Sequence, residues 1–436
     1  MADIHPFRAL RYDLQRVSAA QVVTQPYDKI SPAMQEGYYT ASPYNLVRII
    51  LGRREPDSPA DNVYTRAAAY ARAWRAEGIL RQDSAPSIYA YSQTFTAPSG
   101  AGPSGIAFER RGFIALGRVE DYSAKVVFRH EQTLAKPKAD RLDLLRATRA
   151  HYEQLFLLYE DSREIDSLLA TPQTPTIDVA DEYGVAHRVW QISDPGVIAS
   201  VQEKMRDRKL VIADGHHRYE TALNYRNESR AAAGANSNPQ APYEFVMMTF
   251  VNMNDPGLLV LPTHRVVHSL DSFSMEAFQN SSRSFFEIDE IDPGIDAARS
   301  TTLLRERGRS GTALLAVTAD RALLLHSPKP AGAQFLAGLS DRQRALDVVQ
   351  LHKCLLEGVL KLTEESIRNQ QNLSYVREAS EALHQVRSGS ANIAFLMNPC
   401  PVAQVRDVAF AGEVMPQKST DFYPKLLSGL TAYALD

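Results

Sequence analysis

The sequence predicts a mixed α/β protein, with an N-terminal half in which short strands and helices alternate and a C-terminal α+β half. Up to about residue 270, short apolar runs that suit buried strands alternate with helical periodicity. At Asp214-Gly215 one such strand passes directly into a helix. Beyond residue 270, two successive strands are followed by two helices and a further strand. We therefore expect two domains, residues 1–270 and 271–436, with a loop of the second domain contributing to the site of the first.

The elements of the first half follow from periodicity and turn chemistry. In residues 61–80, small apolar residues and Trp74 alternate with arginines at helical spacing, which predicts an amphipathic helix. Asp194-Pro195 predicts a helix start, because proline suits the first helical position. Asp140 is expected to cap a helix over 140–150. The expected strands are 87–94, 111–116, 155–159, 210–212, 245–253 and 258–261.

The second half shows strand patterns and helical patterns in separate groups. The expected strands are 312–317, 321–326 and 391–397, and the expected helices are 344–361 and 375–388. No repeat of fixed period is visible, which excludes solenoid and propeller architectures.

Composition narrows the classes of function. Charged residues make up 23% of the 436 residues and the net charge is −3, so the chain has no overall basic field for coating nucleic acid. No apolar run reaches the ~18 residues of a membrane span, and the N-terminus lacks the apolar core of a secretory signal. The two cysteines, Cys354 and Cys400, stand far apart and in no metal-binding spacing. We expect a soluble cytoplasmic protein with no membrane partner.

The segment 209–223 carries the most chemistry. Within seven positions it places a carboxylate, a glycine, two imidazoles, a guanidinium and a second carboxylate, and burying such groups unpaired is costly. These residues are Asp214, Gly215, His216, His217, Arg218 and Glu220. A glycine between strand and helix lets the backbone approach a ligand, the helix N-terminus favours an anion, and an arginine can hold phosphate oxygens. The segment predicts a phosphate site.

Two earlier clusters also place polar groups at turns. Asp28 follows Pro26-Tyr27, although an ordinary turn with an Asx hydrogen bond is the simpler interpretation of that tripeptide. Asn45 and Arg48 stand close together after a second turn.

A third cluster directly follows the apolar run 126–128. It contains Arg129, His130 and Glu131, and then Lys138, Asp140 and Arg141. Loops at strand ends hold ligands in many α/β proteins, whereas charge runs are usually solvated, so the two interpretations stand level.

Two later clusters complete the set. Thr263, His264 and Arg265 lie at a strand boundary, where a histidine is more often structural than functional. Lys418, Ser419 and Thr420 lie in a proline-bounded loop that suits either a phosphate cradle or a surface turn.

Metal binding by the two adjacent histidines is not expected, because neighbouring side chains seldom face one ion. Without cysteine spacing, a structural zinc site is also not expected. Mg²⁺ that arrives with a polyphosphate and binds Asp214 is the more plausible metal. The sequence contains neither a Gly-x-Ser-x-Gly elbow nor a Walker-type loop.

Taken together, these clusters resemble a known family. The Asp-Gly-His-His-Arg turn is similar to the phosphate-binding Gly-x-His-Arg turn of the ParB/sulfiredoxin superfamily. Over nearly its whole length, the chain more closely resembles the DUF1015 family, which is related to the free serine kinases of that superfamily. The resemblance rests on Pro26–Asp28, 45–48, 129–131, 138–141, 213–222, 261–265 and 415–420. The chain departs from the family pattern at Asp421, where an aromatic residue usually stands.

The resemblance implies phosphoryl transfer to the hydroxyl of a free amino acid such as serine or threonine, from ATP, ADP or pyrophosphate with Mg²⁺. Gly215 and the amides after it would hold phosphate, with His217 and Arg218 neutralising charge. Asp28, Asp214 and Glu131 are alternative bases. Arg48, Arg129 or Arg265 would bind the acceptor carboxylate. The remaining predicted site residues are Asn45, His130, Lys138, Arg141, His216, Glu220, Thr263, His264, Lys418, Ser419 and Thr420.

Two other classes of function stay open. A ParB-like nucleotide-dependent switch or nucleic-acid-binding protein would share the turn, although no helix-turn-helix or basic helix follows it. A phosphohydrolase would use the same anion site with water as the acceptor.

Overall fold

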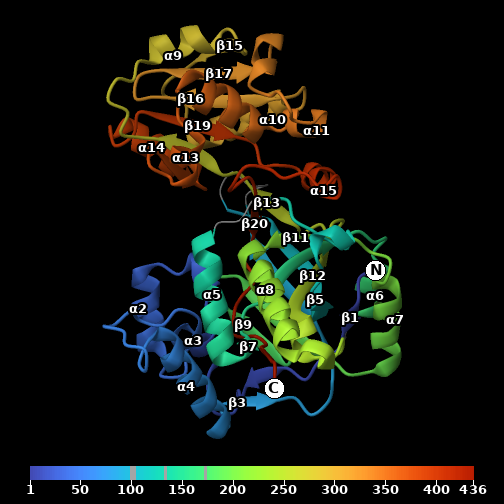
Figure 1. Cartoon of the computed structure of the whole chain (residues 1–436). Coiled ribbons are helices and arrows are strands. Elements are labelled where there is room, and N and C mark those ends of the chain that lie inside the picture. Colours follow the sequence, from blue (N-terminus) through green and yellow to red (C-terminus); the bar gives the residue numbers. More distant parts are fainter. Residues whose placement is uncertain (99–104, 132–134, 171–173) are drawn as a thin grey trace.

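The computed structural model describes residues 1–98, 105–131, 135–170 and 174–436, with the backbone alone for 135–137. Within these residues the chain forms two bodies, each built on its own sheet and joined at the strands β13 and β20 (Figure 1). Both chain termini lie in the body that contains the larger sheet (Figure 1).

The larger sheet has nine strands in the order β6-β11-β8-β12-β5-β4-β10-β9, with β1 paired to β5. It is mixed, because β11 runs parallel to β6 and β12 runs parallel to β8, while the other pairs are antiparallel. Its strands are β1 (Ile4–His5), β4 (Ile88–Thr96), β5 (Ala107–Arg118), β6 (Val127–Phe128), β8 (Leu155–Tyr159), β9 (Ile177–Ala180), β10 (Ala186–Ile192), β11 (Leu210–Asp214) and β12 (Phe245–Asn252).

Helices pack beside this sheet, and α5 and α8 run side by side (Figure 1). The α-helices of this body are α1 (Ala19–Val22), α2 (Pro32–Ala41), α3 (Val47–Ile50), α4 (Val63–Ala76), α5 (Ala135–Thr148), α6 (Glu164–Leu168), α7 (Pro195–Met205) and α8 (His216–Ala233). Short 3₁₀ turns lie at η1 (Tyr27–Lys29), η2 (Tyr122–Ala124), η3 (Gly234–Asn236) and η4 (Pro242–Glu244). The helix start at α7 is confirmed, because Asp194 accepts hydrogen bonds from the N–H groups of Gly196 (2.8 Å) and Val197 (3.0 Å).

The smaller body is a six-stranded sheet in the order β15-β17-β16-β19-β14-β18. Its strands are β14 (His264–Val267), β15 (Glu287–Ile291), β16 (Ala313–Val317), β17 (Ala322–His326), β18 (Leu373–Val376) and β19 (Ile393–Met397). Its helices are α9 (Met275–Ser282), α10 (Ala297–Gly308), η5 (Pro330–Gln334), α11 (Asp341–Arg344), α12 (Asp347–Gln350), the π-helix η6 (Leu351–Val359), α13 (Glu364–Arg368), α14 (Ala379–Arg387) and α15 (Val402–Phe410).

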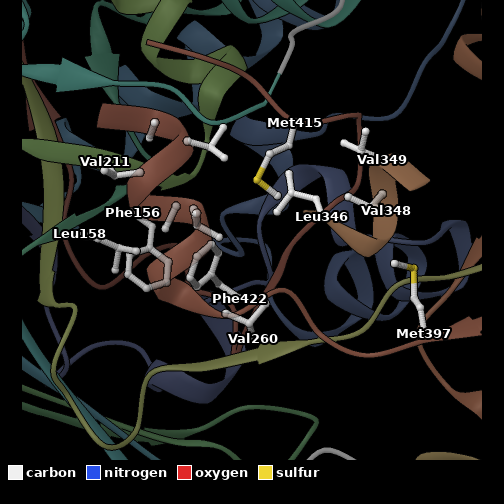
Figure 2. Packing of buried hydrophobic residues seen from close by; sticks show 14 of the residues in the cluster. Phe156, Leu158, Val211, Val260, Leu346, Val348, Val349, Met397, Met415 and Phe422 are labelled. Atoms are coloured by element: carbon white, nitrogen blue, oxygen red, sulfur yellow. The ribbon is translucent and has the colours of Figure 1, made fainter. Parts of the chain in front are cut away.

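The last segment of the chain returns to the larger body. Strand β20 (Asp421–Tyr423) pairs with β13 (Leu259–Leu261), and β21 (Tyr433–Ala434) pairs with β7 (Ala150–His151). A further two-stranded sheet joins β2 (Leu10–Tyr12) to β3 (Leu80–Gln82). One apolar cluster spans the junction, and in Figure 2 it combines Phe156 of the large sheet with Val349 of the smaller body and Phe422 of the returning segment. The return therefore ties the last segment of the chain to β13 and then to β7.

The mixed α/β fold class is confirmed, and most predicted strands of the first half lie within one or two residues of their observed bounds. Two element predictions are wrong. Asp140 does not cap a helix, because α5 begins at Ala135; its carboxylate instead contacts Arg141 (2.6 Å) and the Tyr64 hydroxyl (2.9 Å). The helix expected over 375–388 starts later, because residues 373–376 form β18 against β14. The predicted domain boundary near residue 270 stays a prediction.

In the part of the chain that the structure describes, none of the helices combines the length and apolar character needed to cross a membrane.

Candidate functional site

The strand-to-helix turn forms as predicted. Strand β11 ends at Asp214, Gly215 adopts φ +91°, and α8 begins at His216. The positive φ favours glycine at this position, and a Cβ on Gly215 would lie tightly against Leu155 Cδ2 at 3.0 Å and the Arg218 guanidinium at 3.1 Å. Within the described ranges no side chain caps this helix start, and the first N–H groups of α8 have no acceptor inside the helix.

Asp214 is held between two cations. Its Oδ2 accepts a hydrogen bond from Arg218 (2.8 Å), and its Oδ1 lies 3.4 Å from Lys425 Nζ. Burial alone would raise the pKa of Asp214, but Lys425 and Arg218 outweigh it and hold that pKa well below its ordinary value. Arg218 also donates to the carbonyl of Gln154, so this guanidinium both holds the backbone beside the turn and neutralises Asp214.

Lys425 joins the returning segment to the turn. Although burial opposes its charge, Asp214 and Asp421 raise the pKa of Lys425 above its ordinary value. Asp421 Oδ1 lies 3.0 Å from Lys425 Nζ, and its Oδ2 lies 2.7 Å from Arg377. Burial opposes the charge of Asp421 too, but these two cations lower its pKa to about 2. The lysine is therefore a fixed positive charge beside the turn.

Two buried arginines hold the backbone of the returning segment. Arg110 donates to the carbonyls of Tyr423 (3.1 Å) and Pro424 (2.5 Å). Arg265 donates to the carbonyls of Gln417 (3.3 Å) and Lys418 (3.1 Å). Burial lowers the pKa of both arginines to about 10, which leaves them charged at neutral pH. The position of the lysines in this segment thus depends on clamps far away in sequence.

A histidine-glutamate pair receives the loop that precedes β20. His130 is fully buried; its Nδ1 lies 2.7 Å from the Ile212 carbonyl and its Nε2 lies 2.8 Å from Thr420 Oγ1. Burial lowers the pKa of His130, so the neutral ring donates from Nδ1 and accepts at Nε2. Glu131 Oε1 accepts from the N–H groups of Ser419 (3.0 Å) and Thr420 (3.1 Å). This contact brings the loop before β20 against Glu131. That the loop contributes to a functional site stays a prediction.

His216 presents an unsatisfied atom in the middle of this site. Its ring packs edge-on against His130, with ring centroids 4.8 Å apart. Burial holds the pKa of His216 well below its ordinary value, and the neighbouring His130, His217 and Arg129 act in the same direction, although Asp214 opposes them. Its Nε2 is buried, and no hydrogen-bond partner reaches it from the residues that the structure describes. Buried polar atoms of this kind usually have a partner, so the atom marks a place where a ligand would bind.

Further charges surround the same turn. Lys138 contacts Glu220 (2.7 Å), and Arg129 lies 3.6 Å from that carboxylate. His217 is half-buried, and burial lowers its pKa. Lys138 and Lys418 lower this pKa further, whereas Glu220 and Asp28 raise it. Lys418 and Asp28, which are both exposed, therefore lie near His217.

Asp28 is the least committed carboxylate. Among the described residues no hydrogen bond reaches it, and it acts electrostatically on Lys29, Arg218 and Lys425. Burial and then Lys425 lower the pKa of Lys29. Asp28 and Lys29 both lie in η1, so this short 3₁₀ turn brings one free acid and one cation to the site.

Several predicted residues serve the framework instead. Asn45 is fully buried, where it donates to the Gln21 carbonyl (2.8 Å) and accepts from the Val47 N–H (2.9 Å). Arg48 donates to the Tyr39 carbonyl (2.9 Å) and lies 4.3 Å above that ring.

The arginines and histidine of the later clusters are engaged as well. Arg141 donates to the Ile50 carbonyl (2.6 Å) and stacks 4.1 Å above Tyr27. His264 accepts from the Met397 N–H (3.3 Å), and burial lowers its pKa to about 3. Arg265 also donates to the Thr263 carbonyl, so Thr263, His264 and Arg265 hold the junction rather than line the turn.

A resident metal centre has little support. Both oxygens of Asp214 face cations, and the described ranges contain no group of three metal-ligating side chains. Mg²⁺ at this site would depend on phosphate oxygens, water and one free carboxylate, Asp28, which is a set that suits Mg²⁺.

Four charged residues near the turn were not predicted from the sequence as part of the site: Lys29, Glu153, Asp421 and Lys425. Burial raises the pKa of Glu153, although Arg218 and Arg141 oppose that effect, and it accepts from the Tyr27 N–H (3.0 Å). The only signal for Lys425 was its position four residues after Asp421 in the predicted loop. Glu153 lies two residues before the apolar run of β8, so only the fold reveals its neighbours.

The fold and site describe a mixed α/β protein with a cationic strand-to-helix turn, completed by its own C-terminal segment. The chain belongs to the family described as protein of unknown function DUF1015, whose model matches residues 4–349. No curated protein matches the sequence.

Solved structures show remote similarity. A free serine kinase in complex with AMP is 12% identical with a TM-score of 0.34, over 68% of this chain and 83% of that chain. A conserved hypothetical protein from Pyrococcus furiosus is 12% identical with a TM-score of 0.34, over 68% and 87%. C-terminally truncated SbnI from Staphylococcus aureus is 9% identical with a TM-score of 0.35, over 72% and 85%. Similarity at this level carries no information about the reaction of this chain.

Proposed function

We propose that the protein transfers a phosphoryl group from ATP, ADP or pyrophosphate to the hydroxyl of a free amino acid such as serine or threonine. The observation that carries the proposal is the buried, unpartnered Nε2 of His216 at the uncapped start of α8. A helix N-terminus and an unsatisfied imidazole nitrogen beside several cations suit an anionic group with multiple oxygens.

The residues divide the work between binding and proton transfer. The first amides of α8 and His216 hold the transferred group, while Lys29, Lys418 and Lys425 provide positive charge for it. Asp28 accepts the proton of the acceptor hydroxyl, because Asp214 and Glu131 are already committed to cations or to backbone N–H groups. Phosphoryl transfer depends mostly on such positioning and charge stabilisation. Mg²⁺, when bound with the donor, would neutralise phosphate charge.

Phosphorus NMR tests the reaction directly. The full chain is incubated with Mg²⁺ and serine or threonine, and with ATP, ADP or pyrophosphate in separate samples. We expect a phosphomonoester resonance of phosphoserine or phosphothreonine with one of the donors. Inorganic phosphate without a phosphoamino acid would show a hydrolase and refute the transferase.

Asp28→Asn tests the role of the base. Loss of a general base lowers kcat by about 10²–10⁴-fold, with donor binding retained. Asp271→Asn is the matched control, because Asp271 is an exposed loop aspartate outside this site. Equal rates for the two variants would exclude Asp28 as the base.

A further inference from the structure

The smaller body contains a cavity of about 270 Å³ that shares no lining residue with the turn. It lies between η6, α13, β18 and the segment 414–417. Most of its wall follows residue 349, where the family model ends. Its volume is close to the lower end of small-molecule pockets, roughly 300 Å³, so its occupant is small.

The cavity combines an apolar interior with a balanced charged rim. Val349, Ile367 and Met415 line it and are buried from solvent. Figure 2 shows that Val349 and Met415 belong to the apolar cluster at the junction of the two bodies.

At the rim, two ion pairs stand on neighbouring helices. Lys353 Nζ lies 2.8 Å from Glu357, and Arg368 lies 2.9 Å from Glu364. The rim therefore carries two positive and two negative side chains. His352 adds no charge, because burial and two nearby cations lower its pKa well below the ordinary value.

This arrangement selects the class of ligand. A nucleotide or polyphosphate would bring several negative charges to a rim whose cations are already balanced by glutamates. A purely apolar molecule would remove water from both ion pairs and provide no replacement. A zwitterion with an apolar side chain satisfies both demands, since its carboxylate and ammonium extend the ion pairs while the side chain fills the interior. We propose that this cavity binds a free α-amino acid with an apolar side chain, of the size of leucine or methionine.

Two further features support a ligand site here. Lys353 and Glu357 stand on the π-helix η6, and π-helical turns frequently occur at functional sites. Tyr375 lines the cavity, and its hydroxyl is buried with no hydrogen-bond partner in the described part of the chain.

The cavity also touches the loop that enters the turn site. Gln417 lines it, and Arg265 donates to the carbonyls of both Gln417 and Lys418. Arg265 further contacts His352 (3.3 Å) and lies 5.1 Å above the Tyr375 ring. An amino acid in the cavity would therefore stabilise the loop that carries Lys418. This inference goes beyond the proposed function and does not depend on it.

Isothermal titration of the full chain tests the site with L-leucine, L-isoleucine, L-methionine and L-phenylalanine. We expect saturable binding of at least one of them. For leucine-type ligands, 3-methylbutylamine, which lacks the carboxylate, and 4-methylpentanoate, which lacks the ammonium group, should each bind about tenfold more weakly or worse. Failure of all four amino acids to bind, or equal binding by either analogue, overturns the proposal.

Variants separate this cavity from the turn. Ile367→Trp fills the interior and should abolish binding. Lys353→Met changes a partly exposed side chain and should weaken binding roughly tenfold. Asp28→Asn should leave leucine binding unchanged even where turnover is lost. Binding that survives both cavity variants refutes the site, and hydrogen exchange over 414–420 should slow only when the amino acid binds.

Discussion

Lys425→Met tests whether the returning segment completes the site electrostatically. Its side chain is only 10% exposed and stands between Asp214 (3.4 Å) and Asp421 (3.0 Å). Breaking a buried ion pair costs about 3–5 kcal/mol, because the remaining charge loses its partner. Each carboxylate here retains one arginine, Arg218 at 2.8 Å or Arg377 at 2.7 Å. We therefore expect the lower end, a loss of about 3 kcal/mol in the free energy of unfolding.

Urea unfolding at neutral pH, monitored by circular dichroism, measures this loss. Lys204→Met is the matched control, because Lys204 is 34% exposed and its partner Glu164 is 56% exposed. That surface pair should contribute less than about 1 kcal/mol. Adding Asp421→Asn to Lys425→Met should recover part of the loss, since it removes one uncompensated carboxylate. Equal stability of the Lys425 and Lys204 variants would refute the argument.

Three further predictions concern single side chains. Gly215→Ala should destabilise the turn by about 1–2 kcal/mol and reduce turnover, because it places a Cβ at φ +91°. Urea unfolding would measure the loss of stability, and a turnover assay would measure the loss of activity. The pKa of Asp421 is depressed to about 2, so its ionised carboxylate stabilises the fold above pH 4. This stabilisation, about 2 kcal/mol, is lost as the pH falls through about 2. Asp421→Asn should therefore flatten the acid unfolding curve between about pH 4 and pH 2. Burial raises the pKa of Asp347 to about 7, so between pH 4 and 7 the folded state holds a proton that the unfolded state has lost. The free energy of unfolding therefore falls as the pH rises through that range. Asp347→Asn should raise the midpoint of urea unfolding at pH 8 but not at pH 4.

Local signals predicted the turn because its chemistry is contiguous. The apolar run before Asp214, the glycine and the polar helix start all lie within ten residues, and their backbone geometry follows from those residues alone. The helix start at Asp194-Pro195 was predictable for the same reason. The sequence also pointed to the His130-Glu131 cluster and the loop at Lys418, and it predicted that a C-terminal loop would contribute to the site without naming the residues that meet.

The remaining parts of the site depend on contacts between distant segments. Lys425 reaches Asp214 across 211 positions, and two clamps, Arg110 and Arg265, fix its segment from two different sheets. Arg265 illustrates why residue type alone misleads. An arginine beside a histidine suits an anion site. Arg265, however, is buried and donates to the backbone carbonyls of Gln417 and Lys418 instead.

The polar groups of the candidate site therefore fall into two sets: those that already have a partner in the fold, and those that have none among the described residues. Asp214, Asp421 and Glu131 are engaged by cations or N–H groups, so they set the positions of the turn, of Lys425 and of the loop before β20. His216 and Asp28 differ, because neither the imidazole Nε2 nor the carboxylate has a hydrogen-bond partner within the described ranges. A preorganised site keeps fixed charges for stabilisation and leaves free groups for the reacting molecule. Under the proposed function, a phosphoryl group at His216 and an acceptor hydroxyl at Asp28 would each meet a group that has no hydrogen-bond partner among the described residues.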